Sequence, residues 1–211
     1  MPYQIYALCA RLKTVRKEID GMNKLLYIGI DSVGAGALAG CVLAAAVMLP
    51  PDHGIEGIKD SKKLSTRRRA ALYEEITEKG IWGIGIASPD QIDRMNVQQA
   101  DLAAFGVALG NCLRNAPAGK FPVIVDGNKM IPYYLGEQYA VVDADNIYEN
   151  VSAASIVAKH TRDEMMVKEY AVRYPIYRFE VHKGYGTKMH LALLKEFGPC
   201  DIHRKTFSGV K

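Results

Sequence analysis

The sequence lacks three features, and each absence excludes a class of protein. No apolar run reaches the roughly 18 residues that a membrane-spanning helix needs, and the first residues are too basic for a secretory signal peptide. No Cys-x-x-Cys pair occurs among the cysteines, which lie far apart at Cys9, Cys41, Cys112 and Cys200. Their spacing fits neither a zinc cluster nor a dense disulfide framework. We therefore expect reduced thiols and a cytoplasmic location.

Net charge is also small, at +4 for 211 residues. The basic excess is local, because residues 159–211 contain eleven Lys or Arg and six Asp or Glu. Such a region favours partners that carry phosphate groups, and the alternative is a solvated surface with surplus lysine. With 49% hydrophobic residues, the chain is long enough to bury one full core and to carry a small appendage.

The appendage is expected at the N-terminus. Apolar residues recur at steps of three and four over residues 1–24, which predicts an amphipathic helix that ends at Gly21. They are Ile5, Leu8, Leu12, Val15 and Ile19. Translation beginning at Met22 is the alternative, and the preceding residues would then be upstream sequence read through.

After residue 24, short apolar runs alternate with helical segments. The runs predict strands over residues 25–30, 41–49, 81–87, 121–125 and 139–142. The helical patterns cover residues 66–79, 97–114, 151–174 and 187–197, the first with Ser65 as its cap and Gly80 at its end. Strands followed by helices, then helices alone, predict an α/β core of residues 25–211 with a C-terminal helical extension.

Three of the predicted strands run into an aspartate, at Asp31, Asp126 and Asp145. Carboxylates gathered at one edge of a sheet repel one another unless a cation lies between them. Oxygen ligands suit Mg²⁺ or Mn²⁺, and two such ions can promote phosphodiester hydrolysis. Asp143 precedes Asp145 by two residues, so in an extended segment both would face one way. The plainer alternative is that each Asp marks a strand end or a turn.

A competing motif overlaps the first of these aspartates. Residues 34–39, Gly-Ala-Gly-Ala-Leu-Ala, fit the G-x-G-x-x-A turn of a dinucleotide-binding domain. That hypothesis, an oxidoreductase, needs a helix over residues 41–47 and an acidic residue at the end of the next strand. The loop from Pro50 onward supplies no such strand.

Several separate blocks of the sequence resemble the type 2 ribonuclease H family, ribonuclease HII, from about Leu26 to the C-terminus. The blocks are Gly29-Ile-Asp31 with glycines after it, Asp60-Ser-Lys-Lys-Leu-Ser65, Val125-Asp-Gly-Asn128, Ala153-Ala-Ser-Ile-Val-Ala-Lys159 with Thr161-Arg-Asp163, Lys183-Gly-Tyr-Gly-Thr187, and His203-Arg204 before Phe207. The resemblance implies an RNase H-like mixed central sheet flanked by helices. It also implies an endonuclease that uses four carboxylates and two divalent ions, Mg²⁺ or Mn²⁺. Its substrates would be the RNA strand of RNA/DNA hybrids and DNA 5′ of an embedded ribonucleotide.

The resemblance assigns roles to individual residues. Asp31, Asp126 and Asp145 match three of the four catalytic, metal-binding carboxylates. Tyr185 matches a tyrosine that stacks at the ribose and helps to sense its 2′-hydroxyl, and the turn of Gly34, Ala35 and Gly36 contacts the ribose through its backbone. The basic residues in the matching blocks lie near the phosphate backbone or brace the site. These are Lys62, Lys63, Lys159, Arg162, Lys183 and Arg204.

The chain departs from the family pattern in the opening stretch. The family motif at this place is Asp-Glu-x-Gly-Arg-Gly-Pro, whereas here Ser32 replaces the Glu and Ala35 replaces the Arg. A serine hydroxyl is neutral and a weaker Mg²⁺ ligand than a carboxylate, so one ion should bind more loosely. Asp143 stands where the family usually has Lys and is a hypothetical substitute. Two functions follow: a ribonuclease HII with an altered site, or an inactive relative that binds RNA/DNA hybrid. We expect a monomer and predict no protein partner.

Overall fold

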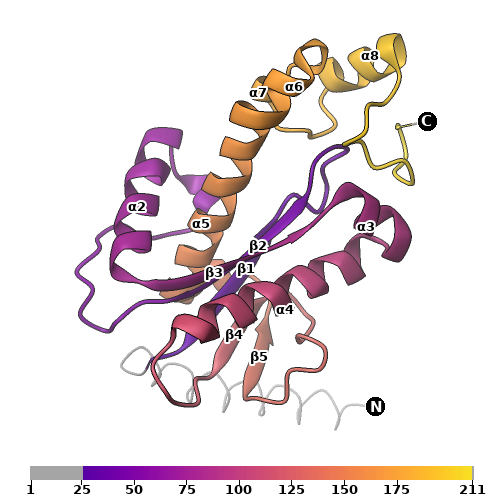
Figure 1. The fold of residues 1–211 in the computed structure, drawn as a ribbon. Helices are drawn as coiled ribbons and strands as arrows, with labels where there is room; N and C mark the ends of the chain where they lie inside the picture. Colours follow the sequence, from indigo (N-terminus) through magenta and orange to yellow (C-terminus); the bar gives the residue numbers. More distant parts are fainter. Residues whose placement is uncertain (1–25, 211) are drawn as a thin grey trace, which may run out of the picture.

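The computed structural model describes residues 26–210, and a mixed five-stranded sheet crosses their centre (Figure 1). The strands lie in the order β3-β2-β1-β4-β5. Their bounds are β1 (Ile28–Val33), β2 (Val42–Met48), β3 (Ile81–Ala87), β4 (Val123–Asp126) and β5 (Gln138–Val141). β1, β2 and β3 pair antiparallel, whereas β4 runs parallel to β1 and to β5. The predicted N-terminal helix and the alternative start at Met22 lie outside the described residues.

Helices follow β2, β3 and β5 in the chain. The longer ones are α2 (Thr66–Lys79), α4 (Val97–Asn115), α5 (Glu149–Met165) and α8 (Lys188–Phe197). The short segments are η2 (Ser61–Lys63), α3 (Pro89–Met95), η3 (Ala144–Asn146), the π-helical turn η4 (Met166–Tyr170), α6 (Ala171–Arg173), η5 (Pro175–Tyr177) and α7 (Phe179–His182). Within residues 26–210, no helix is both long enough and apolar enough to span a bilayer.

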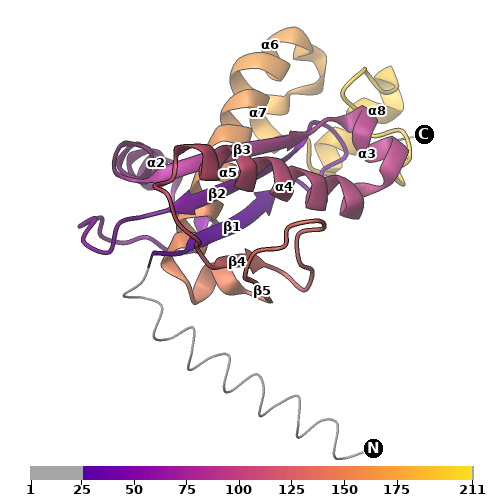
Figure 2. The ribbon, with the colours of Figure 1, turned by 60° about the horizontal axis from the view of Figure 1, so that its bottom comes forward.

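The two faces of the sheet carry different helices (Figures 1 and 2). Side chains alternate along a strand, so one set from β1 and β2, including Ile28 and Ile30, packs with α4. The opposite set, including Leu43 and Ala45, packs with α2 and α5. α7, α8 and the C-terminal segment form a separate apolar cluster beside the loop that joins β1 to β2. The result is an α/β core with a C-terminal helical extension, as the sequence predicted.

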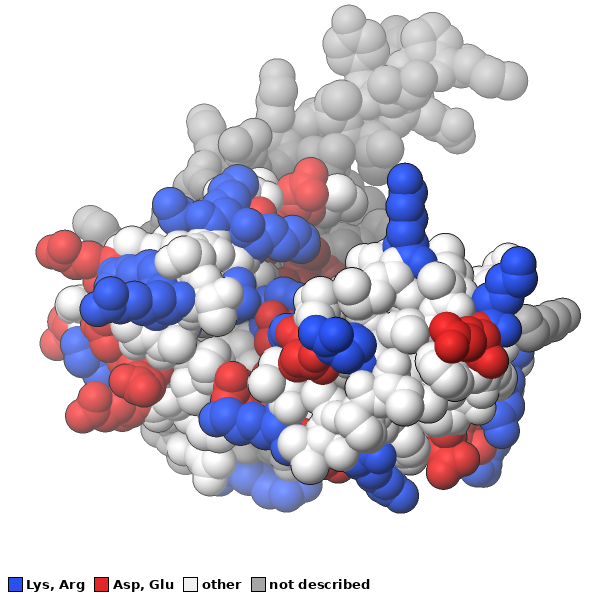
Figure 3. Space-filling model, turned by 90° about the horizontal axis from the view of Figure 1, so that it is seen from above, with Lys and Arg blue, Asp and Glu red and all other residues white. Residues whose placement is uncertain are grey.

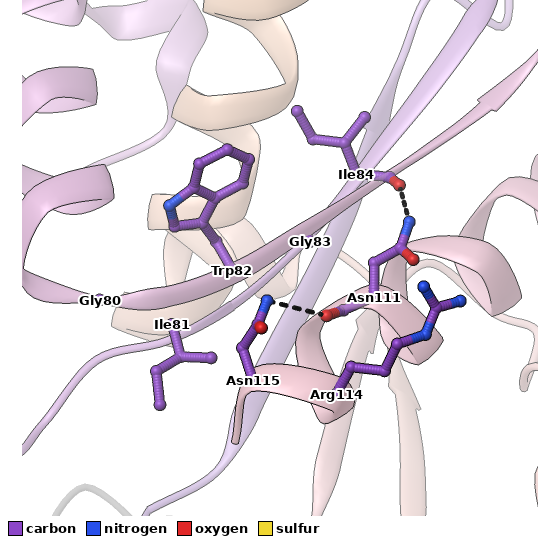
Figure 4. A pocket seen from close by; sticks show the side chains of 8 residues that line it. All are labelled: Gly80, Ile81, Trp82, Gly83, Ile84, Asn111, Arg114 and Asn115. Carbon is purple, nitrogen blue, oxygen red and sulfur yellow. Dashed lines mark hydrogen bonds between the residues drawn. The ribbon is translucent and has the colours of Figure 1, made fainter.

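At Gly83 and Gly85 the edge strand β3 lies so close to α4 that no side chain would fit between them. A Cβ at Gly83 would lie 2.3 Å from the backbone nitrogen of Cys112, and the Asn111 amide donates to the Ile84 carbonyl at 2.7 Å (Figure 4). A surface pocket of about 640 Å³ opens beside this contact, and no acidic side chain lines it. This pocket therefore offers no carboxylate chemistry.

Most predicted elements are confirmed, several to within a residue or two. α2 begins after Ser65, whose hydroxyl accepts from Arg68 N at 3.3 Å, and it ends before Gly80. The predicted first strand, residues 25–30, was wrong at its end: β1 continues to Val33, because Asp31 and Ser32 pair with β2. Since residues 42–48 are a strand, Gly34 does not open the helix that a dinucleotide-binding turn requires, and that hypothesis is wrong.

We expect Gly85→Ala to destabilise the protein by about 2–3 kcal/mol, because the added Cβ needs α4 to move away from the sheet. That Cβ would lie 2.0 Å from the Ala104 carbonyl oxygen. Gly110→Ala on α4 is the matched control, since a Cβ there meets no heavy atom within 4 Å. Its stability should stay level or rise by up to about 1 kcal/mol. Urea unfolding measures both, and equal effects would contradict this account of the packing.

Candidate active site

Asp31 lies within β1 and faces α5. Gly29, two residues earlier on the same face, approaches the α5 backbone directly. The Asp31 side chain is buried, and its Oδ1 accepts from Ser32 N at 2.7 Å. Burial raises the pKa of the Asp31 carboxyl to about 7, the nearby charge of Asp126 adds to the rise, and hydrogen bonding from Ser155 opposes it. The folded chain therefore makes ionisation of Asp31 costly.

Asp126 ends β4, directly beside Asp31. The register pairs Ile30 with Val125 on parallel strands, so the two aspartates follow at equivalent positions. Asp126 Oδ1 accepts from Ala144 N at 2.8 Å, which ties β4 to the segment after β5. Burial raises the pKa of Asp126, and backbone hydrogen bonds from Ala144 and Asp145 lower it in part.

Asp145 enters the site from the 3-10 turn η3, after β5. Its side chain is buried, and its backbone carbonyl accepts from the Ser152 hydroxyl at 2.6 Å. Burial raises the pKa of Asp145, and the charges of Asp126 and Asp60 raise it further. The structure thus brings together the three aspartates that the sequence selected. The charge of Asp126 raises the pKa of both Asp31 and Asp145, and the charge of Asp145 raises the pKa of Asp31.

Asp143 does not share a strand face with Asp145, and that prediction was wrong. β5 ends at Val141, and Asp143 precedes η3 in the left-handed region with φ 57°. Its side chain is exposed. Its charge still raises the pKa of Asp126 and Asp145, although it contributes less to each rise than burial does. Asp143 therefore lies near the site on its solvent side.

Ser32 faces α4, on the opposite side of the sheet from Asp31. It meets Asp101 there, a residue that the sequence analysis did not select. Burial raises the pKa of the Asp101 carboxyl, hydrogen bonding with the Ser32 side chain opposes the rise, and the charge of Asp126 reinforces it. The available signal was a lone acid on the apolar stripe of a predicted helix, four residues before Phe105.

Two of the predicted basic residues stand exposed beside the carboxylates. Lys62 Nζ lies 3.8 Å from Asp145 Oδ2, and its side chain is 78% exposed. Lys63 is exposed as well and lies 3.9 Å from Asp60. Lys159 is half-buried, and its Nζ donates a hydrogen bond to Asp163 at 2.8 Å. Seen from above, Lys and Arg side chains are interleaved with acidic ones rather than gathered in one patch (Figure 3).

Arg162 and Arg204 are fully buried, at 0% exposure, so direct contact with a substrate is excluded in this conformation. Arg204 donates to the carbonyls of Gly34 at 2.7 Å and Ala35 at 2.8 Å, and it also donates to Gly40. Arg162 donates to the carbonyls of Ala39, Cys41 and Lys183. Of the two roles predicted for these arginines, contact with the phosphate backbone or bracing of the site, their hydrogen bonds fit the bracing of the loop after β1.

The braced loop presents an exposed turn next to Tyr185. Ala35 and Gly36 are exposed, and Gly34 has φ +94°, a conformation that favours glycine. Ala37 forms an isolated antiparallel bridge with Tyr185. The Tyr185 ring has Lys159 Nζ at 5.4 Å and the Arg162 guanidinium at 5.3 Å from its centroid. These contacts hold the ring in place beside the turn. Lys183, from the same segment, is half-buried, and its Nζ donates to the Glu180 carbonyl.

The donor set at this site suits a hard divalent cation. All of its acidic groups are oxygen ligands, and each has a raised pKa that a bound cation would lower. Among residues 26–210, no three His, Cys, Asp or Glu side chains lie in an arrangement that could hold a metal ion as they stand. Binding would therefore require the carboxylates to turn toward the ion, which their mutual repulsion otherwise resists.

Comparison with known proteins gives a consistent result. The family model described as Ribonuclease HII matches residues 28–210. A ribonuclease HII of Polynucleobacter asymbioticus is 44% identical over 193 residues, covering 90% of this chain and 96% of the relative. The crystal structure of ribonuclease H2 from Pyrococcus horikoshii has a TM-score of 0.72 at 24% identity, covering 88% of this chain and 95% of that one. Bst-RNase HIII in complex with Mn²⁺ has a TM-score of 0.73 at 18% identity, covering 89% and 68%.

The raised pKa of Asp31 predicts how stability depends on pH without metal. Between about pH 4 and pH 7 the folded chain keeps the Asp31 proton and the unfolded chain has lost it. Stability should therefore fall as pH rises through this window, by up to about 4 kcal/mol from this group. Urea unfolding in EDTA measures the fall. Asp31→Asn should flatten the profile and Asp143→Asn should keep it, and a wild-type profile as flat as that of Asp31→Asn would contradict the prediction.

Proposed function

This chain belongs to the ribonuclease HII family, and we propose that it hydrolyses the RNA strand of RNA/DNA hybrids and cuts DNA 5′ of embedded ribonucleotides. The proposed catalytic unit covers residues 25–211. The observation that carries the proposal is the meeting of Asp31 from β1, Asp126 from the end of β4 and Asp145 from the turn η3, each with a raised pKa. Perturbed acids in one place are typical of a catalytic site.

Asp31, Asp126 and Asp145 are the residues that would hold Mg²⁺ or Mn²⁺. A divalent ion bound there supplies water activation and stabilisation of the leaving oxygen. The chain's own part is to fix the carboxylate positions. The Ala144 N–H holds Asp126, the Ser32 N–H holds Asp31, and the Ser152 hydroxyl holds the backbone of Asp145. Because these bonds come from three different segments, correct folding is needed before the donor set exists.

The turn of residues 34–36 and Tyr185 are proposed to bind the ribose at the cleavage point. Exposed backbone at Ala35 and Gly36 lies next to the half-buried Tyr185 ring. Backbone groups can recognise a 2′-hydroxyl, and an aromatic ring can stack on the sugar and base. The buried Arg162 and Arg204 fix this loop from behind, so the absence of an Arg side chain at Ala35 leaves the turn itself intact.

Phosphate contacts are proposed for Lys62, Lys63 and Lys183. Lys62 and Lys63 are exposed beside the carboxylates. Lys183 adjoins Gly184, which accepts hydrogen bonds from the loop residues Leu38 and Ala39. Lysines placed around a carboxylate cluster attract the nucleic-acid backbone, and the attraction weakens as salt rises.

An inactive relative that binds RNA/DNA hybrid is the second candidate, and Ser32 is the observation that favours it. A hydroxyl there brings no charge to the site, so the site must acquire a fourth carboxylate elsewhere or work with three.

A DNA duplex that contains one ribonucleotide tests the proposal. With Mn²⁺ or Mg²⁺, the wild-type chain should cut 5′ of the ribonucleotide. Asp126→Asn should lower the rate by at least about 100-fold, near 3 kcal/mol in activation free energy, because a ligand loses its charge. Asp143→Asn, on the solvent side, should cut within about twofold of wild type. Binding of the duplex by wild type without cleavage would establish the second candidate, and failure to bind would refute both.

A further inference from the structure

Asp101 is an acid in a position that the packing assigns to an apolar residue. It stands on α4 in line with Phe105, Ala108 and Cys112, at helical spacings of four, seven and eleven residues. Those three side chains are buried in the core against the sheet. The stripe that packs α4 onto the sheet therefore begins with a carboxylate at the end nearest Ser32.

One oxygen of Asp101 is left without a partner. The Oδ1 atom is enclosed by protein and receives no hydrogen bond, one of only three such side-chain atoms among residues 26–210. Buried polar atoms are normally paired, so an unpaired carboxylate oxygen requires an explanation. The Ser32 side chain partners the group from β1, and Asp126 is close enough for its charge to disfavour ionisation of Asp101.

Asp101 and Asp126 also line the same cavity. Its volume is about 100 Å³, and its wall continues along Gly127 and Asn128. A space of this size accommodates an ion with water, since one water molecule needs only about 10–15 Å³ in the same measure. Lys129 also lines the cavity. Two carboxylates that line one small cavity form an arrangement that a divalent cation would stabilise.

We propose that Asp101 supplies, from α4, the metal-binding carboxylate that Ser32 does not supply from β1. The inference rests on the proposed function, because it concerns the divalent ions of that site. Ser32 has a short side chain that leaves room for Asp101 and hydrogen-bonds with it, whereas a glutamate at position 32 would add a like charge at the same place. Asp143, the other candidate, is exposed, whereas Asp101 has an enclosed oxygen and lies against Ser32.

Binding of Mn²⁺ to the metal-free protein tests the inference without reference to activity. Calorimetric titration of the full chain should show one Mn²⁺ bound at least about tenfold more weakly by Asp101→Asn than by wild type. Asp143→Asn, matched in charge change, should bind as wild type does. The double variant Ser32→Glu, Asp101→Asn should regain the lost affinity, because it moves the carboxylate back to β1. Wild-type Mn²⁺ binding by Asp101→Asn would overturn the inference.

Stability in EDTA separates this role from a structural one. At pH 8, Asp101→Asn should be at least as thermally stable as wild type, because it removes a charge that its surroundings and the nearby Asp126 disfavour. Added Mn²⁺ should raise the melting temperature of wild type more than that of the variant. A variant less stable than wild type in EDTA would show that Asp101 serves packing, and would overturn the inference. Mn²⁺ binding through Asp101 without cleavage by wild type would refute only the proposed function.

Discussion

Repulsion among buried carboxylates is the constraint on which the rest of this structure depends. Asp31, Asp126 and Asp145 come from β1, β4 and the turn after β5, and the fold places them where burial and mutual charge oppose ionisation. A folded protein tolerates such a cluster because a proton or a cation can relieve it. The arrangement of the sheet therefore favours a proton or a cation between these groups, since the parallel pair β1 and β4 sets Asp31 beside Asp126.

At the same end of the sheet, buried arginine side chains hold the loop that is proposed to bind the ribose. Arg162 on α5 and Arg204 near the C-terminus donate only to backbone carbonyls in the hydrogen bonds found for them, mostly of residues 34–41. Planar guanidinium groups suit this task because several donors act in a fixed geometry. Burial lowers the pKa of Arg204 to about 10, so it remains charged at neutral pH. The C-terminal helical extension thereby takes part in shaping the active site.

The sequence predicted the α/β core and three of the site's carboxylates because those features are local: short apolar runs, caps such as Ser65, and aspartates next to strands. Prediction from the sequence failed where contacts between distant residues determine the local structure. β1 continues past Asp31 only because β2 pairs with Ser32 and Val33. Asp143 takes a left-handed conformation that alternation along a strand does not anticipate. Arg162 and Arg204 looked like surface cations, and their burial depends on carbonyls more than a hundred residues away. Asp101 needed both Ser32 and Asp126 in place before its role was visible.

The central claim is that carboxylates from separate elements hold divalent ions together at one end of the sheet. A crystal structure of the protein soaked in Mn²⁺, with anomalous scattering data, tests it most directly. The account predicts anomalous peaks within about 2.5 Å of carboxylate oxygens of Asp31, Asp126 and Asp145, with Asp101 as a further ligand. Absence of any Mn²⁺ peak among these aspartates at saturating metal would contradict the account.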